Sequence, residues 1–314
     1  MKSVAIDYNE GDGWAAAQGD CVKLMRTMPE NSVHHICTSV PFSSLLLYSA
    51  SDYDFGNCRS DSEFFDQFRF FVDELYRVTM PGRIAAVHCM ILPLSKARDG
   101  RTGLKDFRGD CVRAFERGGW IFHSETGIWK CPVVAVTRTK AHGLLHKTLK
   151  KDSCRSRTGI LDYLCAFRKP GDNPEPVSHT AEEYPVSKWQ KVASPGWKID
   201  ESDPNEMPIA DAFWDDINQT DTLNVTSARD ENDSVHLCAL QQQVIERSVE
   251  LWSNPGDVVF DPFGGIGSVP YKALKMGRRG LMHELKTSYY RQSVRNLHGA
   301  KKQLSMFSDL AAAQ

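Results

Sequence analysis

The chain has 314 residues, of which 41% are hydrophobic and 25% are charged, and its formal net charge is −2. This composition is typical of a globular protein with one large domain or two modest ones and enough apolar residues for a core. The near-neutral charge excludes a uniformly basic coat for nucleic acids, so any contact with them must come from local clusters of Lys and Arg.

The cysteines and the apolar runs limit where the protein works. Nine cysteines are scattered singly, without a CxxC pair, which is typical of a reducing cytosol rather than of secretion. No apolar run approaches the roughly 18 residues of a membrane span, and the N-terminus lacks the apolar stretch of a signal peptide. We therefore expect a soluble cytoplasmic protein without a membrane partner and without a metal site.

The N-terminal part predicts two strands with a helix between them. Residues 14–20 (WAAAQGD) form an apolar run that ends in Gly19-Asp20, and a helix with an apolar stripe is predicted over 21–28. The next strand is predicted over 33–37. It leads directly into the segment Thr38-Ser39-Val40-Pro41-Phe42.

The strongest helical pattern of the chain lies at 61–80, where aromatic and aliphatic residues form one stripe. Ser60 or Asp61 can cap its start, and Pro81-Gly82 ends it. Three more elements follow: a strand at 84–88, a helix at 106–117 and a strand or hairpin limb at 120–129. This alternation predicts an α/β fold, a doubly wound and mostly parallel Rossmann-like sheet covered on both faces. The histidines on these strands, His88 and His123 with the pair His34-His35, are interpreted as core or rim residues rather than metal ligands.

A basic segment interrupts this pattern. Residues 138–157 contain seven Lys and Arg and two His against a single acid, Asp152. On a chain of balanced charge, such a cluster is expected for phosphate binding, although a solvated basic surface is an equally good interpretation. Residues 170–233 then show little regular pattern. We assign 131–233 to an inserted region, and residues 14–130 and 234–297, with a strand at 163–168, to one domain.

The C-terminal part contains a glycine-rich turn between a strand and a helix. Val258 to Phe260 form a buried strand, which runs into Asp-Pro-Phe-Gly-Gly-Ile-Gly-Ser at 261–268 and a helix. Glycines allow a backbone to approach a ligand closely, although such turns also occur for packing alone. The next strand, 279–284, ends in Glu284, where doubly wound folds place the acid that binds ribose hydroxyls. A final helix is predicted over 287–297, with a frayed tail from residue 298.

Two motifs resemble those of S-adenosylmethionine-dependent DNA amino-methyltransferases. The segment 261–268 is similar to the family motif DPF-x-G-x-G-[ST], and residues 39–42 (SVPF) are similar to [DNS]-P-P-[YFW]. Because the second of these stands first in the chain, the order resembles the permuted β group. The resemblance covers 14–168 and 234–297, and it implies methyl transfer to an exocyclic nitrogen of cytosine or adenine.

The resemblance also implies which residues hold S-adenosylmethionine. In the family, the Asp and the glycines of the motif hold the methionine part, and the acid after the second strand holds the ribose. A polar residue near the N-terminus lies by the adenine, and the helix start before the glycine strand forms another wall. The residues at these positions are Asp261, Pro262, Phe263, Gly264, Gly265, Gly267, Ser268, Glu284, Asp20, His236 and Leu237.

The other motif implies the catalytic residues Ser39, Val40, Pro41 and Phe42. An exocyclic amino nitrogen is a poor nucleophile, and its base must be flipped out of the duplex. Hydrogen bonds to the Ser39 side chain and the Val40 carbonyl would draw electron density towards the nitrogen, and Phe42 would stack on the base. The family has proline at the position of Val40, so the stiffness of a Pro-Pro pair is lost here.

Several functions stay open on the sequence alone. Serine at the first motif position favours N4 of cytosine, whereas N6 of adenine is the alternative, since Asp or Asn would favour it. A methyltransferase for RNA on the same fold and a DNA-binding protein that has lost catalysis are further alternatives.

The resemblance implies that the protein acts on double-stranded DNA as a monomer or homodimer, and that the inserted, irregular region 131–233 recognises the DNA target. Bacteria and phages encode such enzymes in restriction–modification systems. The basic residues expected on DNA are Arg138, Lys140, Lys147, Lys150, Lys151, Arg155 and Arg157.

Overall fold

The structure is a computed structural model that describes residues 1–42, 55–58, 60–94, 96–133, 145–157, 159–187, 213–224, 228 and 239–312. Within these residues, nine strands form one sheet in the order β1-β2-β11-β10-β3-β4-β8-β7-β9. The strands are β1 (Asp7–Gly11), β2 (Trp14–Gln18), β3 (Val33–Ser39), β4 (Thr79–Met90), β7 (Ile121–Ile128), β8 (Asp162–Arg168), β9 (Phe213–Trp214), β10 (Val258–Asp261) and β11 (Arg279–Glu284).

The centre of the sheet is parallel. Strands β2, β11, β10, β3 and β4 pair in parallel, while β1 is antiparallel to β2 at one edge. Strand β8 lies between β4 and β7 and is antiparallel to both, and β9 pairs in parallel with β7. The prediction of a mostly parallel α/β sheet is confirmed.

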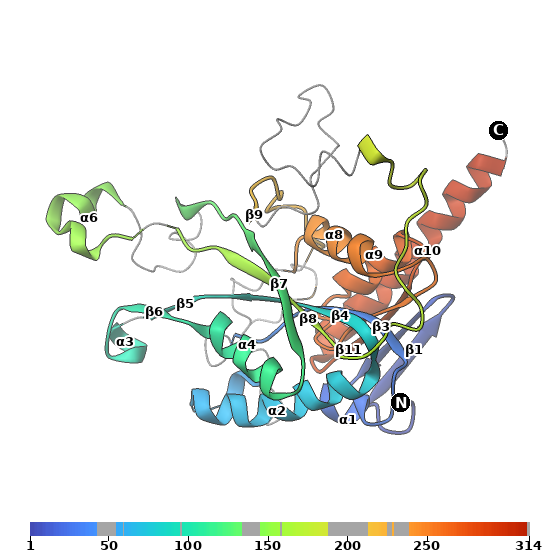
Figure 1. Cartoon of the computed structure of the whole chain (residues 1–314), viewed down its shortest axis with the longest axis horizontal. Helices are drawn as coiled ribbons and strands as arrows, with labels where there is room; N and C mark the ends of the chain where they lie inside the picture. The colour runs from blue at the N-terminus through green and yellow to red at the C-terminus, as the bar shows by residue number, and fades with distance from the viewer. Residues whose placement is uncertain are drawn as a thin grey trace.

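Helices cover both faces of the sheet, as a doubly wound fold requires (Figure 1). One face carries α1 (Cys21–Met25), α2 (Asp61–Val78) and α4 (Phe107–Arg117). The opposite face carries α8 (Gln242–Trp252), α9 (Ser268–Lys275) and α10 (Thr287–Ala312). The predicted stripe of α2 is buried against the sheet, and Ser60 caps the helix by accepting a hydrogen bond from Glu63 N at 3.1 Å.

The strand order creates a switch point between β3 and β10. From β3 the chain passes through α2 to β4 on one side, and from β10 it passes through α9 to β11 on the other. The two strands are paired, with Phe260 opposite Ile36 and Val259 opposite His35. Because ligands of such folds bind beyond the carboxyl ends of strands at a switch point, this edge is where a site is expected.

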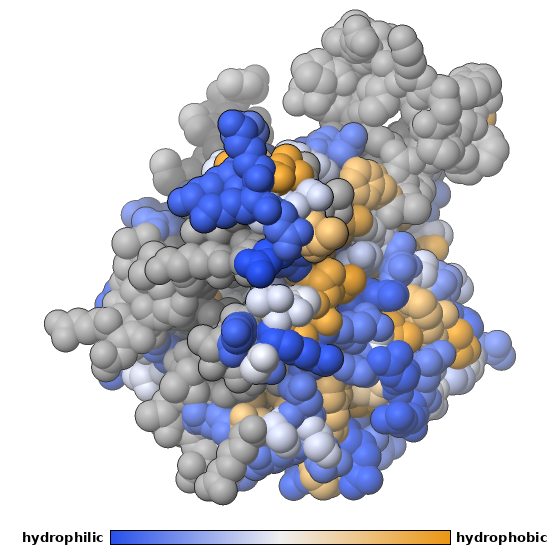
Figure 2. Space-filling view, turned by 90° about the vertical axis from the view of Figure 1, so that its left-hand side faces the viewer, coloured by the Kyte–Doolittle hydropathy of each residue, from blue (hydrophilic) through white to orange (hydrophobic). Residues whose placement is uncertain are grey.

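Smaller elements extend from that edge. Strand β4 continues into a two-stranded sheet of β5 (Leu92–Leu94) and β6 (Gly103–Lys105), with α3 (Lys96–Asp99) between them. Helix α6 (His146–Lys151) lies on the same side, at the left of Figure 1. Figure 2 looks at this side and shows hydrophilic residues interrupted by hydrophobic ones. The exposed apolar residues of these segments include Leu104, Leu145 and Leu149.

Several elements differ from the sequence prediction, which also lacked β5, β6, α3 and α6. Strand β1 was not predicted, and β9 joins the main sheet although it lies in the region assigned to the insertion. The prediction of a frayed tail from residue 298 is wrong, because α10 continues to Ala312. Ala300 is buried in a cluster with Trp14, and the His298 ring meets the Trp14 ring edge to face at 5.0 Å. Among the described helices, none combines the length and apolarity needed to cross a membrane.

Candidate active site

The serine motif begins at the last residue of β3. Ser39 ends the strand, and Val40 is buried, with its N–H donating to the carbonyl oxygen of His88 on β4 at 3.3 Å. The half-buried Phe42 ring meets the rings of His88 and Phe107 edge to face, at 6.2 and 6.3 Å between centroids. Neighbouring strand and helix residues therefore hold the motif in place.

The glycine motif forms a tight turn between β10 and α9. Gly264 N donates to the carbonyl oxygen of His283 at 2.8 Å, and Gly267 adopts φ +84°, which favours glycine. A Cβ at Gly264 would lie 2.8 Å from Cβ of Met282, closer than side chains tolerate. A Cβ at Gly265 would meet nothing within 4 Å. The loop thus packs on β11 at one glycine and leaves open space at the next.

The carboxylate of Glu284 lies against this turn. Its Oε2 accepts from Gly265 N at 2.8 Å, and its Oε1 accepts from Lys286 N at 2.7 Å. Gly19 N donates to the carbonyl oxygen of Glu284 at 2.9 Å, and the next residue, Asp20, caps α1 through Lys23 N at 2.7 Å. The ends of β2, β10 and β11 therefore bring Asp20, Glu284 and the glycine turn to one edge.

A hydrogen bond joins the two motifs. Thr38 Oγ1 donates to Oδ1 of Asp261 at 2.7 Å, and Phe263 N donates to the same oxygen at 3.1 Å. Asp261 is 5% exposed. Burial raises the pKa of its carboxyl to about 7, although the two hydrogen bonds oppose the shift. Residues 38 and 261, which are distant in the chain, are thus in direct contact at the predicted edge.

Ser39 contacts a polar chain that the sequence did not reveal. Its Oγ lies 2.9 Å from Nδ1 of His88, whose Nε2 lies 2.9 Å from Oδ2 of Asp162, and Lys130 forms an ion pair with that carboxylate. His88 is a buried and hydrogen-bonded histidine, as interpreted, but one of its partners is the motif serine. The only hint in the sequence that His88 could lie near Ser39 was its position near the end of a predicted strand. Asp162 gave none, because it begins an antiparallel strand.

A family model of DNA methylases matches residues 33–295, a span that includes both motifs. The chain belongs to this family of N6 and N4 DNA methylases. It is therefore an S-adenosylmethionine-dependent methyltransferase that acts on DNA.

Solved structures share the fold of this methylase. TTHA0409 of Thermus thermophilus, a candidate DNA modification methylase complexed with S-adenosyl-L-methionine, is 21% identical, with a TM-score of 0.62 and coverage of 91% of this chain and 93% of that chain. The PvuII DNA methyltransferase (cytosine-N4-specific) is 16% identical, with a TM-score of 0.61 and coverage of 90% and 86%. At such identities the likeness is one of fold. Among curated proteins, none is similar enough in sequence to match.

The structure describes some, but not all, of the basic residues that are expected to contact DNA. In the methylase, Lys147, Lys150 and Lys151 are exposed on α6, and Arg155 is exposed in the short helical turn Ser153–Arg155. Arg157 is half-buried, and burial lowers the pKa of its guanidinium. Two other expected DNA contacts, Arg138 and Lys140, lie outside the described residues, as do the expected cofactor residues His236 and Leu237.

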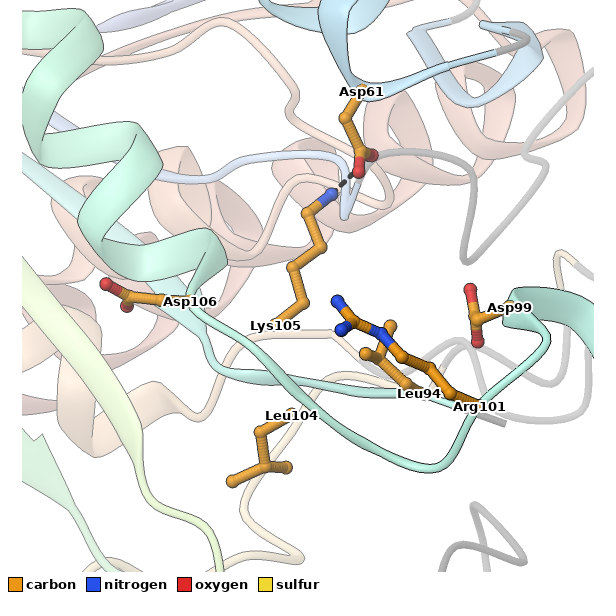
Figure 3. Close-up of a pocket in the computed structure, with 7 residues that line it drawn as sticks. All are labelled: Asp61, Leu94, Asp99, Arg101, Leu104, Lys105 and Asp106. Atoms are coloured by element: carbon orange, nitrogen blue, oxygen red, sulfur yellow. Dashed lines mark ion pairs between the residues drawn. The ribbon is translucent and has the colours of Figure 1, made fainter. Parts of the chain in front are cut away.

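A polar hollow lies beside the start of α2 (Figure 3). Asp61, Arg101 and Lys105 are among the residues that line it, and Lys105 forms an ion pair with Asp61. None of its lining residues belongs to either motif of the methylase. The hollow therefore adds nothing to the candidate active site.

A group of possible metal ligands lies at the opposite edge of the sheet. Within the described ranges, His34, Glu175 and Asp257 bring ligand atoms within 4.8 Å of one another. Arg83 already pairs with this group, 3.1 Å from Asp257 and 3.9 Å from Glu175. His34 and Asp257 stand at the amino ends of β3 and β10, away from both motifs of the methylase. A buried arginine thus balances the charge of this cluster.

Proposed function

We propose that the methylase transfers a methyl group to the N4 nitrogen of cytosine at a specific site in double-stranded DNA. The hydrogen bond between Thr38 and Asp261 carries the proposal. It places the residue before Ser39 in contact with the first residue of the cofactor motif. A nucleobase at Ser39 and a cofactor at the glycine turn would thus be neighbours at one edge of the sheet.

The residues around the glycine turn fit the cofactor. The close packing of Gly264 and the open space at Gly265 allow a ligand to lie along the backbone. The Asp261 carboxylate can accept hydrogen bonds from a charged amino group, and Glu284 from ribose hydroxyls. Asp20 directly follows Gly19, whose N–H donates to the carbonyl oxygen of Glu284, and it would lie by the adenine. When bound, S-adenosylmethionine supplies a methyl group activated by a positively charged sulfur.

The serine motif fits a flipped base. Ser39 Oγ and the Val40 carbonyl would accept hydrogen bonds from the amino group, which makes its nitrogen more nucleophilic. Phe42 is half-buried and held by two rings, so it can offer a fixed face for stacking. Val40 replaces a proline of the family motif, yet its side chain is buried in the core. The packing of Val40 thus restricts the backbone in part, as the proline ring would.

Serine at the first motif position supports cytosine rather than adenine as the substrate. The PvuII methyltransferase, which shares the fold, is specific for cytosine N4. Adenine methylation at N6 is the second candidate, because the geometry of Ser39 suits any exocyclic amino group.

The test is to incubate the protein with unmodified plasmid and S-adenosylmethionine, digest the DNA and analyse the nucleosides by mass spectrometry. N4-methylcytosine is the expected product. N6-methyladenine would replace the cytosine assignment with the adenine one. Methylation of single-stranded RNA alone would favour an RNA enzyme, and absence of S-adenosylmethionine binding at millimolar concentration would favour a DNA-binding protein without catalysis. Ser39→Ala serves as control, because it should impair transfer more than cofactor binding.

A further inference from the structure

A series of hydrogen bonds connects Ser39 to side chains on two neighbouring strands, so that it spans β3, β4 and β8. It runs from Ser39 Oγ to Nδ1 of His88, and from Nε2 of His88 to Oδ2 of Asp162, with both distances 2.9 Å. Lys130 pairs with the same carboxylate. His88 is 6% exposed and Asp162 is 1% exposed. Since water is largely excluded, these hydrogen bonds are stronger and more orienting than surface contacts.

The charge of Asp162 determines where the hydrogens lie. Burial by itself would raise the pKa of Asp162, but the Lys130 ammonium and the His88 hydrogen bond hold that pKa below its ordinary value. Asp162 is therefore a carboxylate, which only accepts hydrogen bonds. Nε2 of His88 must carry the hydrogen between them. Lys130 supplies a positive charge that balances the Asp162 carboxylate.

A neutral imidazole with its hydrogen on Nε2 leaves a lone pair on Nδ1. The hydroxyl of Ser39 then donates its hydrogen to Nδ1, and the Oγ lone pairs stay available to other donors. With the hydrogen on Nδ1 instead, His88 would donate to Ser39. The hydrogen of the serine hydroxyl would then be free to rotate, and nothing would fix the hydroxyl as an acceptor for an incoming amino group.

We propose that His88 is a positioning residue, held by Asp162, that fixes the hydroxyl of Ser39 as an acceptor for the amino group of the target base. The proposal rests on the proposed role of Ser39. An acceptor aligned before the base arrives needs no reorganisation when the amino nitrogen attacks. His88 also meets Phe42 edge to face, so one side chain orients both the acceptor and the stacking ring.

Two substitutions of His88 separate its two contacts. In His88→Gln, the amide can reach Asp162 as Nε2 does, but no acceptor remains beside Ser39. In His88→Asn, the amide oxygen can take the place of Nδ1, and the contact to Asp162 is lost. We expect kcat to fall about 100-fold in His88→Gln, as for loss of one aligned catalytic hydrogen bond. His88→Asn should retain more activity, with little change in KM for DNA in either variant.

A double-mutant cycle tests whether His88 acts through Ser39. His88→Gln should cost almost nothing further in a Ser39→Ala background, because residues that act as a unit are not additive. Additive losses would overturn the proposal and indicate a purely structural histidine. The control is His123→Gln on β7, an exposed histidine that should keep wild-type kcat.

The tautomer can be measured on the wild-type protein without DNA or cofactor. Nitrogen-15 NMR of the histidine-labelled full chain should show His88 with hydrogen on Nε2 and none on Nδ1, assigned by the missing signals of His88→Gln. A hydrogen on Nδ1, in either the neutral or the charged ring, would overturn the proposal. An inactive wild-type protein in the plasmid assay would instead reject the proposed function, so the two failures are distinguishable.

Discussion

Thr38 Oγ1 and Oδ1 of Asp261 lie 2.7 Å apart, and this hydrogen bond connects the strand that ends in the serine motif to the strand that ends in the glycine motif. Both residues are buried, and the acceptor belongs to a carboxyl whose pKa is raised to about 7 by burial. The contact therefore links the two strands, and it also influences the charge of Asp261 in the proposed cofactor site.

The raised pKa of Asp261 predicts a pH-dependent affinity for S-adenosylmethionine. A positively charged ligand binds the carboxylate better than the protonated acid, so below about pH 7 binding must release a proton. The affinity should then rise by up to tenfold per pH unit as the pH increases towards 7, and level off between about pH 7 and pH 8, before the ligand's own amino group loses its proton. Isothermal titration calorimetry between pH 5 and pH 9 (chosen to bracket the pKa of about 7) measures this profile.

The control for this profile is Asp261→Asn, which cannot ionise. We expect weaker binding and a flat dependence on pH, while Asp261→Ala should abolish binding. An unchanged slope in Asp261→Asn would show that another group releases the proton.

Thr38→Val should move the midpoint of the same profile to higher pH. Valine keeps the shape of the buried side chain but cannot donate to Asp261, and hydrogen bonds to charged groups contribute about 1.5 kcal/mol or more. A loss of that size corresponds to a rise of about one pH unit. Thr38→Ser retains the hydroxyl and should titrate like the wild type. Identical profiles for all three proteins would contradict the role assigned to this contact.

Gly264→Ala should destabilise the protein and weaken cofactor binding. The new Cβ would lie 2.8 Å from Cβ of Met282 and 3.2 Å from the carbonyl oxygen of His283, neither of which can move freely. We expect a loss of about 1–3 kcal/mol in the free energy of unfolding, as for overpacked sites. Urea denaturation measures it.

Gly299→Ala on α10 provides the matched control for Gly264→Ala. A Cβ there meets nothing within 4 Å, and alanine favours a helix over glycine by about 1 kcal/mol. The stability should stay equal or rise. If both substitutions changed the free energy of unfolding equally, the glycine turn would accommodate a Cβ at Gly264, which would contradict the short distances found there.

The combined change of Lys147, Lys150 and Lys151 to Gln should weaken DNA binding in a salt-dependent manner. These exposed lysines on α6 can bind phosphates, and each lost phosphate contact lowers the slope of log K against log salt by about 0.9. Fluorescence anisotropy with duplex DNA at several salt concentrations gives that slope.

The charge-matched control for α6 changes Lys2, Lys275 and Lys301 to Gln. These residues lie on the N-terminal segment, α9 and α10, where no DNA contact is proposed. The slope should stay that of the wild type. If the slope of log K against log salt decreases equally in both triple variants, the effect comes from net charge rather than from α6.

Local patterns were enough to predict most of the sheet and the helices. The stripe and the Ser60 cap of α2, the buried run of β10 and the strand that ends in Glu284 all appear where the sequence predicted them. Each depends on periodicity, capping or turn chemistry within a few residues. The true end of α10 was missed, because its packing against Trp14 depends on a strand at the other end of the chain.

The sequence by itself determined the family motifs, the strands that carry them and thus the kind of chemistry. Only the tertiary structure decided that Thr38 meets Asp261, and that His88 and Asp162 stand behind Ser39. Those contacts depend on the order and direction of the strands. In particular, β8 is antiparallel to β4, which brings its first residue to the edge where the parallel strands end. A side-chain pattern encodes which face of a strand is buried, but strand order is fixed by packing over the whole chain.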